Sequence, residues 1–333
     1  MIKTSAVKAI KKSLFIVFLF LLFFDGKCNR GYRKVAQEKA KEEAAAAKKR
    51  IEAEHTKNLL KLVRGIHFTE VKRVFDNGMS FSPVGYQLVP EWRISFPSVD
   101  SVNIFSPKLN KFLNAPVMFD HDSIFNVAWA WLKLKYIKKD SMQFMVLHVH
   151  DDTIVTEKVH VFMTFYTNSY IKDVLHSDTA KLWKPGRRDT DYIRKKAVFA
   201  NHIPDSAFAG TDPPALESRS PLVTVKKKPV DDPVLGGKSY DAYLSPAYDI
   251  TIHHAYQDFG YEYTAFVDEK GNITFRKSLE DLSMSQEIAR NVIAAMKGIT
   301  DSYIKLYVAA TPAKTLGIPH RSIIFMNVVG YKK

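Results

Sequence analysis

The pattern of apolar and polar positions changes character several times along the chain. Residues 14–24 form an unbroken apolar run, and the 13 residues before it include four lysines and no acidic residue. Residues 32–64 contain neither glycine nor proline and are dominated by Ala, Glu, Lys and Arg, which favour a helix. From Gly65 onward, short runs of β-branched and aromatic residues alternate with turn residues, which indicates a folded body.

The apolar run at residues 14–24 predicts export. As a helix it would cover about 17 Å of a hydrocarbon core about 30 Å thick, a length typical of a secretory signal. Cys28, the chain's only cysteine, follows where a bacterial lipoprotein carries its lipidated cysteine, but Lys27 stands where that motif has a small residue. Lipidation of Cys28 and an uncleaved anchor both stay open. Either one predicts that residues 29–333 lie outside the cytoplasm and are tethered to a membrane.

The charge distribution bears on the kind of partner. The formal net charge is +14, but residues 1–73 alone hold 18 basic and 7 acidic residues, so the rest is nearly neutral. A basic end next to an apolar run indicates membrane topology and head-group contact, and argues against a nucleic-acid partner. A single cysteine excludes a disulfide scaffold and Cys-rich metal modules.

The body divides into two expected modules of the α+β class, each ββαββ-like. In the first module, residues 122–137 predict a helix with an apolar face, and residues 142–167 predict a hairpin turning at Asp151-Asp152. Six of the fifteen prolines lie within residues 204–233, which favours a semi-rigid linker. The predicted organisation is an anchor at 1–28, a charged helical stalk at 29–65, a first module at 66–180, a linker at 181–239 and a second module at 240–333.

The second module predicts a hairpin over 261–277, a helix from Ser283 to Gly298, and closing strands at 303–310 and 322–329. The segment FVDEKGNITFRKSLEDLSMSQEIARNVIAAMKG, a following strand, a Gly-Ile-Pro turn and RSIIFMNVVGY together resemble the C-terminal domain of the TonB family. The resemblance covers about residues 258–331. It implies a module that recognises a partner by adding a segment of it to the sheet as an extra strand.

Two candidate sites follow from these patterns. The last strand has little alternation and is expected to be an unpaired edge that docks a partner, through Ser322, Ile323, Ile324, Phe325, Met326, Asn327 and Val328. His148 and His150 would share one face of a strand and suit two metal ligands, although Asp151-Asp152 beside them are the natural turn of a hairpin and His148 is also explained as a partly exposed strand residue.

The predicted function is therefore binding. No Gly-x-Ser-x-Gly, His-Glu-x-x-His or Gly-rich phosphate loop is present, and no catalytic residue or cofactor is expected. We expect a non-catalytic protein on the periplasmic side of the cell envelope, anchored in either membrane, that binds an envelope partner such as an outer-membrane protein. A TonB-type energy transducer and a metal-binding or hydrolytic periplasmic protein are the alternatives.

Overall fold

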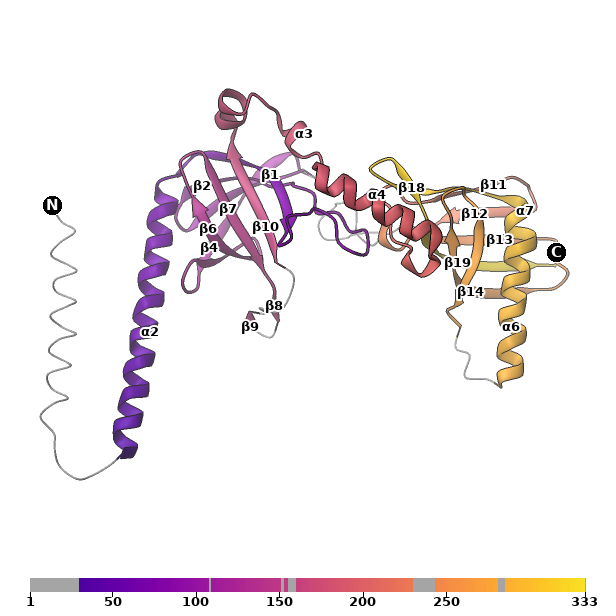
Figure 1. Ribbon diagram of the computed structural model, residues 1–333, viewed down its shortest axis with the longest axis horizontal. Helices are drawn as coiled ribbons and strands as arrows, with labels where there is room; N and C mark the ends of the chain where they lie inside the picture. Colours follow the sequence, from indigo (N-terminus) through magenta and orange to yellow (C-terminus); the bar gives the residue numbers. More distant parts are fainter. Residues whose placement is uncertain are drawn as a thin grey trace, which may run out of the picture. The chain divides into compact units, whose positions relative to one another are not determined.

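The computed structural model of the protein describes residues 30–107, 109–150, 153–154, 160–229, 243–280 and 285–332. The chain divides into two compact units between Glu52 and Ala53. Helix α2 (Arg30–Lys61) crosses that boundary (Figure 1). Its last turn belongs to the second unit, where Leu60 and the following Val63 are buried. Residues 53–65 are thus part of the folded body, and the predicted separate stalk at 29–65 is wrong.

Eight antiparallel strands in the second unit form a closed barrel, in the order β1-β10-β7-β6-β5-β4-β3-β2 (Figure 1). The barrel closes through β1, which pairs with β2 on one side and with β10 on the other. A short hairpin of β8 (Val149–His150) and β9 (Thr153–Ile154) lies between β7 and β10. The barrel strands are β1 (His67–Phe75), β2 (Arg93–Ser98), β3 (Ser101–Ser106), β4 (Lys111–Phe119), β5 (Ile124–Val127), β6 (Ala130–Ile137), β7 (Ser141–Leu147) and β10 (Val161–Thr167).

Side chains fill the barrel interior. Phe144 stacks edge-to-face with Phe125 and with Phe165, at centroid distances of 5.6 and 5.5 Å, and all three rings are fully buried. Leu60 and Val63, at the end of α2, pack in the same cluster. The barrel core is therefore a close-packed interior.

The expected helix at 122–137 is a hairpin of β5 and β6. Its two turn residues, Ala128 and Trp129, both have positive φ, at 47° and 67°, which is the geometry of a type I′ turn. Such turns usually contain Asn or Gly, so the Ala-Trp pair gave no turn signal. All four residues of β5 are buried, and the alternation that marks a half-buried strand is absent.

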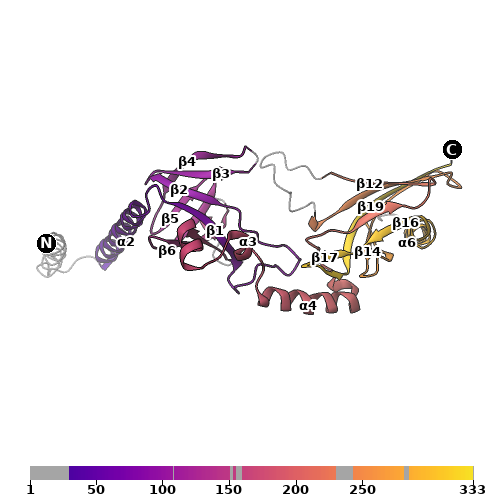
Figure 2. The same cartoon turned by 90° about the horizontal axis from the view of Figure 1, so that it is seen from above.

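The residues after the barrel build a five-stranded sheet in the order β12-β13-β19-β14-β15 (Figure 2). The pairs β12–β13, β19–β14 and β14–β15 are antiparallel, whereas β13 and β19 run parallel. Smaller pairs join β11 to β16 and β17 to β18. The strands are β11 (Ala215–Ser218), β12 (Val223–Lys227), β13 (Ala247–His253), β14 (Phe259–Val267), β15 (Ile273–Ser278), β16 (Val308–Thr311), β17 (Ala313–Thr315), β18 (Ile318–His320) and β19 (Ser322–Tyr331).

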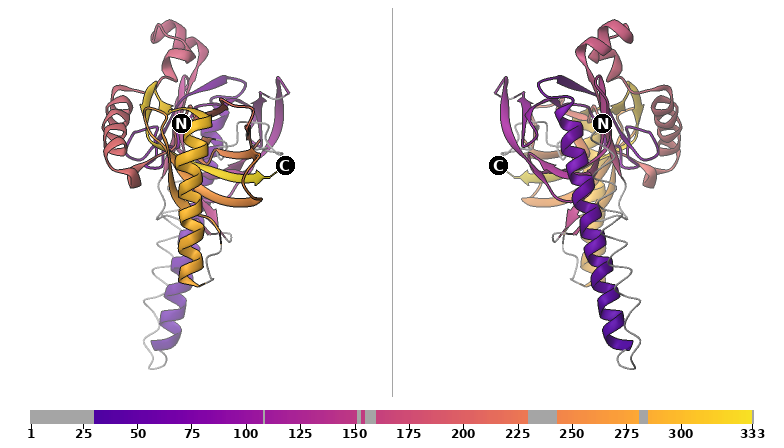
Figure 3. Two further views of the ribbon diagram at one scale, coloured as in Figure 1. Left: turned by 90° about the vertical axis from the view of Figure 1, so that its right-hand side faces the viewer. Right: turned by 90° about the vertical axis from the view of Figure 1, so that its left-hand side faces the viewer.

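Helix α6 packs on one face of this sheet (Figure 3). Its Met296 and the following Ile304 are buried against Tyr263 of β14, whose hydroxyl forms a hydrogen bond of 2.9 Å with Thr300 Oγ1. The helical elements of the second unit are η1 (Tyr170–Val174), α3 (Thr179–Leu182), α4 (Arg187–His202), η2 (Pro204–Ser206), α6 (Gln286–Ile299), η3 (Thr300–Ile304) and α7 (Lys305–Tyr307).

The predicted linker at 181–239 is wrong for the residues that the structure describes there. Residues 187–227 contain α4, η2, β11 and β12, and both strands pair with strands of the C-terminal sheet region. The prolines lie at the ends of these elements, where no ladder donor is lost: Pro204 begins η2, Pro213 and Pro214 precede β11, and Pro221 and Pro229 flank β12. The α+β class with two ββαββ-like modules is likewise corrected to a mostly β body whose first part is a barrel.

Candidate functional site

The C-terminal sheet has two different faces. Along β19, Ile324, Met326 and Val328 are buried on the face that α6 covers, whereas Phe325 and Asn327 are half-buried on the other face. Neighbouring strands continue this division, because residues in register across a ladder point to the same side. The second face is therefore the accessible one.

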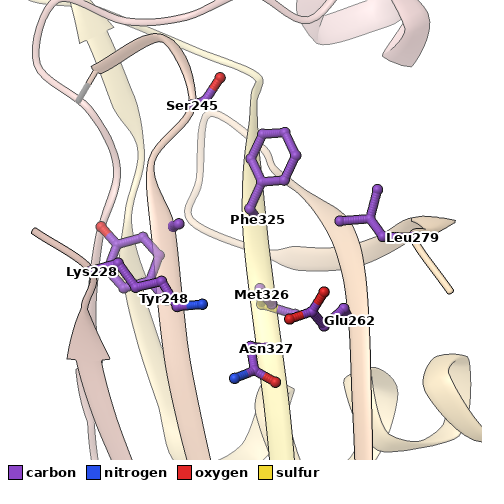
Figure 4. A pocket seen from close by; sticks show the side chains of 9 residues that line it. Lys228, Ser245, Tyr248, Glu262, Leu279, Phe325, Met326 and Asn327 are labelled. Atoms are coloured by element: carbon purple, nitrogen blue, oxygen red, sulfur yellow. The ribbon is translucent and has the colours of Figure 1, made fainter. Parts of the chain in front are cut away.

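A hollow of about 320 Å³ crosses this accessible face (Figure 4). We call it the sheet trough. It extends over all five strands, because each strand or the residue after it contributes to the lining. Figure 4 shows the Phe325 ring at its centre, with Lys228 and Leu279 on either side. The lining residues are Lys228, Ser245, Ala247, Tyr248, Glu262, Leu279, Phe325, Met326 and Asn327.

The two ends of the sheet trough differ in charge. At the β12 end, Lys228 Nζ lies 3.2 Å from Asp249 Oδ1, which also accepts a hydrogen bond of 2.9 Å from Asn327 Nδ2. Toward β15, the Glu262 amide donates to Glu280 Oε1 at 2.7 Å, and no described residue pairs with the Glu262 carboxylate. A surface with apolar side chains between a cation and a carboxylate can orient an extended segment. None of the nine lining residues is a histidine or a cysteine, the usual ligands of a transition metal.

The predicted docking edge at Ser322–Val328 is wrong. Strand β19 lies in the middle of the sheet, where Met326 pairs with Tyr248 on one side and Tyr263 on the other. A nearly continuous apolar strand is typical of such a central position, with a partner on each side. The actual outer strands are β12 and β15. Three of the predicted residues, Phe325, Met326 and Asn327, nevertheless line the sheet trough.

The structure does not bring the other predicted site residues together. His148 is exposed just after β7, and the side chain of His150 on β8 lies outside the described residues, as do Asp151, Asp152 and Cys28. Within the described ranges, no group of three or more His, Cys, Asp or Glu residues is placed to hold a metal ion. None of the helices described there is long and apolar enough to cross a membrane.

No sequence pattern marks the residues that complete the sheet trough. Lys228, Glu262 and Leu279 are separated by at least 17 positions from one another and belong to no common motif. The register of β14 places Glu262 directly opposite Asn327 of β19, and only that long-range pairing makes them neighbours. Leu279, an apolar residue just after the predicted hairpin, was the single local signal.

A buried histidine near the C-terminal sheet was also missed. His320 is fully buried and stacks on Phe208 with a centroid distance of 3.7 Å. Its Nε2 lies 3.0 Å from Thr315 Oγ1 and its Nδ1 lies 3.1 Å from the Arg321 carbonyl oxygen, so the neutral ring donates from Nδ1 and accepts at Nε2. Burial lowers the pKa of His320 to about 4, and this ring is a structural element of the core.

The chain has little detectable similarity to known proteins. No family model matches it, and no curated protein gives a significant match. Among solved structures, it is similar to the bovine lipocalin allergen Bos d 2, with 9% sequence identity, over 39% of this chain and 91% of that chain, at a TM-score of 0.23. The strand pairing described above establishes the barrel on its own, and this similarity adds no functional argument.

Proposed function

We propose that this protein is a non-catalytic, membrane-tethered protein of the cell envelope whose C-terminal sheet binds an extended segment of an envelope partner. The observation that supports the proposal best is the sheet trough, where the half-buried Phe325 ring lines the same hollow as Lys228 and Glu262. Partly exposed aromatic side chains in a hollow are frequent anchors of protein interfaces, and flanking charges set orientation.

The dimensions of the trough fit a short extended segment. Five strands spaced about 4.8 Å apart are about 19 Å wide, which matches roughly six residues of extended chain at about 3.3 Å each. An apolar side chain at the centre would pack on Phe325 and Leu279. A basic residue would face Glu262, and an acidic residue would face Lys228. Such a segment would lie across the strands.

Strand addition is the competing binding mode, and it follows from the resemblance to the TonB C-terminal domain. With β19 central, a new strand could join only β12 or β15. The β12 edge carries Lys226 and Lys227, and lysines on an edge disfavour strand pairing. The six-residue β15 pairs only with β14 among the described strands, so it is the edge to test.

The membrane tether rests on the basic flank, the apolar run at 14–24 and Cys28. Cell fractionation of the wild type and of Cys28→Ala tests it. A membrane-bound wild type and a released variant indicate a lipid anchor, whereas retention of both indicates a protein anchor. A wild type found in the cytosol contradicts the proposed location.

Site-specific crosslinking separates the binding modes. A photo-reactive residue is placed at Phe325 in the trough, at Arg276 on β15, or at the 93%-exposed Trp129 of the barrel as the control. Crosslinked products are identified by mass spectrometry, and the partner segment is then titrated with purified full-length protein. Binding through the trough predicts products from position 325, and at least a tenfold weaker complex for Phe325→Ala.

The outcomes of this experiment are distinct. Products from position 276 alone, with Phe325→Ala binding normally, would replace the trough by strand addition at β15. Products that form equally at Trp129, or at none of the three positions, would contradict partner binding by this sheet. Glu262→Gln reports on orientation, and we expect it to weaken a segment whose basic residue faces that carboxylate.

A further inference from the structure

A second hollow, of about 390 Å³, lies between β1 and the start of α4. We call it the α4 cleft. Its walls come from β1, from the loop between β1 and β2, and from residues 182–189 that end α3 and begin α4. We infer that it is an anion site that binds the phosphate group of a phosphorylated molecule. Its polar lining includes Lys72, Ser80, Lys184, Arg187, Arg188 and Asp189.

Cations outnumber acids in the lining of the α4 cleft. Lys72, Lys184 and Arg188 are exposed and form no ion pair with a described residue, whereas Arg187 Nε lies 3.8 Å from Asp191. The fifth cation of the lining, Arg73, is held by a buried carboxylate on β1 and adds shape but no free charge. The unpaired cations of β1, of α4 and of the segment before α4 line one hollow and give it a positive potential, which attracts anions.

The single acid of the cleft, Asp189, offsets only part of this potential. Asp189 is buried at the start of α4, and backbone amides engage both its oxygens: Ser80 N donates to Oδ1 at 2.8 Å and Gly186 N donates to Oδ2 at 3.1 Å. Its carboxylate therefore fixes the loop to the helix. Lys72, Lys184 and Arg188, which form no ion pair with a described residue, outnumber this one carboxylate in the lining of the cleft.

The start of α4 contributes donors to the same hollow. Helix α4 has 16 residues and begins after Gly186, which has no side chain to cap the first-turn amides. The amides of Arg187 and Arg188 occupy the first turn, where helical geometry supplies no acceptor and the helix dipole is positive. A phosphate oxygen is a suitable acceptor for such amides.

The Ser80 hydroxyl is the independent indication of a ligand. Ser80 lines the cleft, is 8% exposed, and its Oγ has no hydrogen-bond partner among the described residues. Buried hydroxyls are nearly always paired, so this one requires an explanation. Its backbone is already fixed, because its amide bonds Asp189 and its carbonyl accepts from Leu88 N at 2.8 Å. A ligand oxygen in the cleft would supply the acceptor.

The walls of the α4 cleft are held rigidly. Glu70 is fully buried and accepts two hydrogen bonds of 2.7 Å from Arg73, and its Oε2 also accepts from the amides of Glu91 and Trp92. The Trp183 indole Nε1 donates to the Glu70 carbonyl oxygen at 2.8 Å and so joins the segment before α4 to β1. A preorganised site pays little conformational entropy on binding.

The size of the cleft indicates more than inorganic phosphate. A water molecule occupies about 30 Å³ of liquid, so the hollow has room for a phosphate together with an attached group. A soluble phosphomonoester or diphosphate and the head group of an anionic phospholipid share this chemistry. They differ in charge and in esterification, and two probes separate them.

The test is isothermal titration calorimetry of the full chain in an uncharged detergent, with inorganic pyrophosphate and with glycerophosphoglycerol, the deacylated head group of phosphatidylglycerol. The test variants are Lys184→Gln/Arg188→Gln and Ser80→Ala. The charge-matched control is Lys226→Gln/Lys227→Gln on β12, which is remote from the cleft lining. Circular dichroism confirms that each variant is folded.

We expect at least one probe to bind, with affinity reduced tenfold or more in Lys184→Gln/Arg188→Gln, about threefold in Ser80→Ala, and unchanged in the control. Preference for pyrophosphate identifies a soluble phosphorylated ligand, and preference for glycerophosphoglycerol identifies a lipid head group. Equal losses in the cleft and control variants would reduce the effect to net charge and overturn the site. Absence of binding by both probes, or unaltered binding in the folded cleft variant, would also overturn it.

Discussion

The barrel and the C-terminal sheet differ in how they treat their edge strands. Both are largely antiparallel and both bury aromatic residues, but the barrel pairs its first strand β1 with its last strand β10 and so leaves no edge. The C-terminal sheet ends in β12 and β15 and covers only one face with a helix. A closed barrel directs alternate side chains inward to a filled core, whereas an open sheet retains a face and two edges that are accessible to a partner.

Aromatic residues of the barrel and of the C-terminal sheet should respond differently to mutation. In the barrel, Phe125, Phe144 and Phe165 are fully buried in contact with one another. On the accessible face of the sheet, Phe325 is half-buried over a hollow. We therefore expect barrel aromatic residues to determine stability and Phe325 to determine binding.

The largest loss of stability is expected from a substitution inside the barrel. Phe144→Ala removes the central ring of the aromatic cluster, and large-to-small changes of this kind cost about 3–5 kcal/mol. Urea unfolding of the full chain, followed by circular dichroism, measures the change in the free energy of unfolding. Trp129→Ala, at an exposed turn, should stay within about 0.5 kcal/mol. A loss below 1 kcal/mol for Phe144→Ala would mean that the barrel interior is not close-packed.

A pH dependence of similar size should come from the region of β18. Because burial lowers the pKa of His320 to about 4 while the unfolded chain titrates near about 6.5, the unfolded state binds the extra proton between these values. The contribution of His320 is fully present above about pH 6.5 and is lost as the pH falls toward 4, by about 3 kcal/mol in total. The measurement is the unfolding free energy at pH 7 and pH 4.5.

The matched variants isolate this effect. His320→Gln should show a much smaller loss between pH 7 and pH 4.5, even if it is less stable at both. His121→Gln removes a partly exposed histidine beside Asp120 and should retain the wild-type pH dependence. The same slope in His320→Gln and in the wild type would assign the acid sensitivity to other groups.

A smaller loss of stability is expected from a substitution on the face of the C-terminal sheet that α6 covers. Thr300→Val leaves the buried Tyr263 hydroxyl without its hydrogen-bond partner at 2.9 Å while preserving shape, and we expect a loss of about 1–2 kcal/mol. Tyr263→Phe removes the other half of the pair. The double variant should be less destabilised than the sum of the two single variants, which a double-mutant cycle measures. Strict additivity would show that the hydrogen bond contributes nothing.

The smallest change in stability is expected on the accessible face. Phe325→Ala should cost about 1 kcal/mol or less in unfolding, because the ring is only half-buried, while it weakens partner binding at least tenfold. Equilibrium unfolding and titration with the partner segment separate the two quantities. A stability loss as large as that of Phe144→Ala would contradict the distinction between the closed and the open sheet.

Local patterns were sufficient where an element depends on neighbouring residues. The hairpin expected over 261–277 is β14 and β15, with its turn at Asp268, whose carboxylate accepts from the amides of Lys270 and Asn272. The helix expected over Ser283–Gly298 is α6 (Gln286–Ile299), but its cap is Ser285, and the predicted cap Ser283 lies outside the described residues. These signals are short-range and physical, so they can be identified without tertiary structure.

The other features of the fold and of the sites could not be predicted from local sequence patterns. Barrel closure pairs Phe68 with Thr167, nearly 100 positions apart, and the alternation of each strand alone does not distinguish a closed sheet from an open one. The Ala128-Trp129 turn lacks the usual residues, so a hairpin resembled a helix. The α4 cleft depends on the loop at Ser80 meeting Asp189, and no sequence motif links the two.

The central position of β19 also determines the order in which the sheet can be completed. The parallel partner residues Ala247 and Phe325 are 78 positions apart, and β14 pairs with the same strand from the other side. At a synthesis rate of about 5–20 residues per second, β13 would wait several seconds for its neighbour to be made. During that interval the β14–β15 hairpin can form, whereas β12 and β13 have no third strand. This half of the sheet therefore needs protection from misassembly until its last strand has been synthesised.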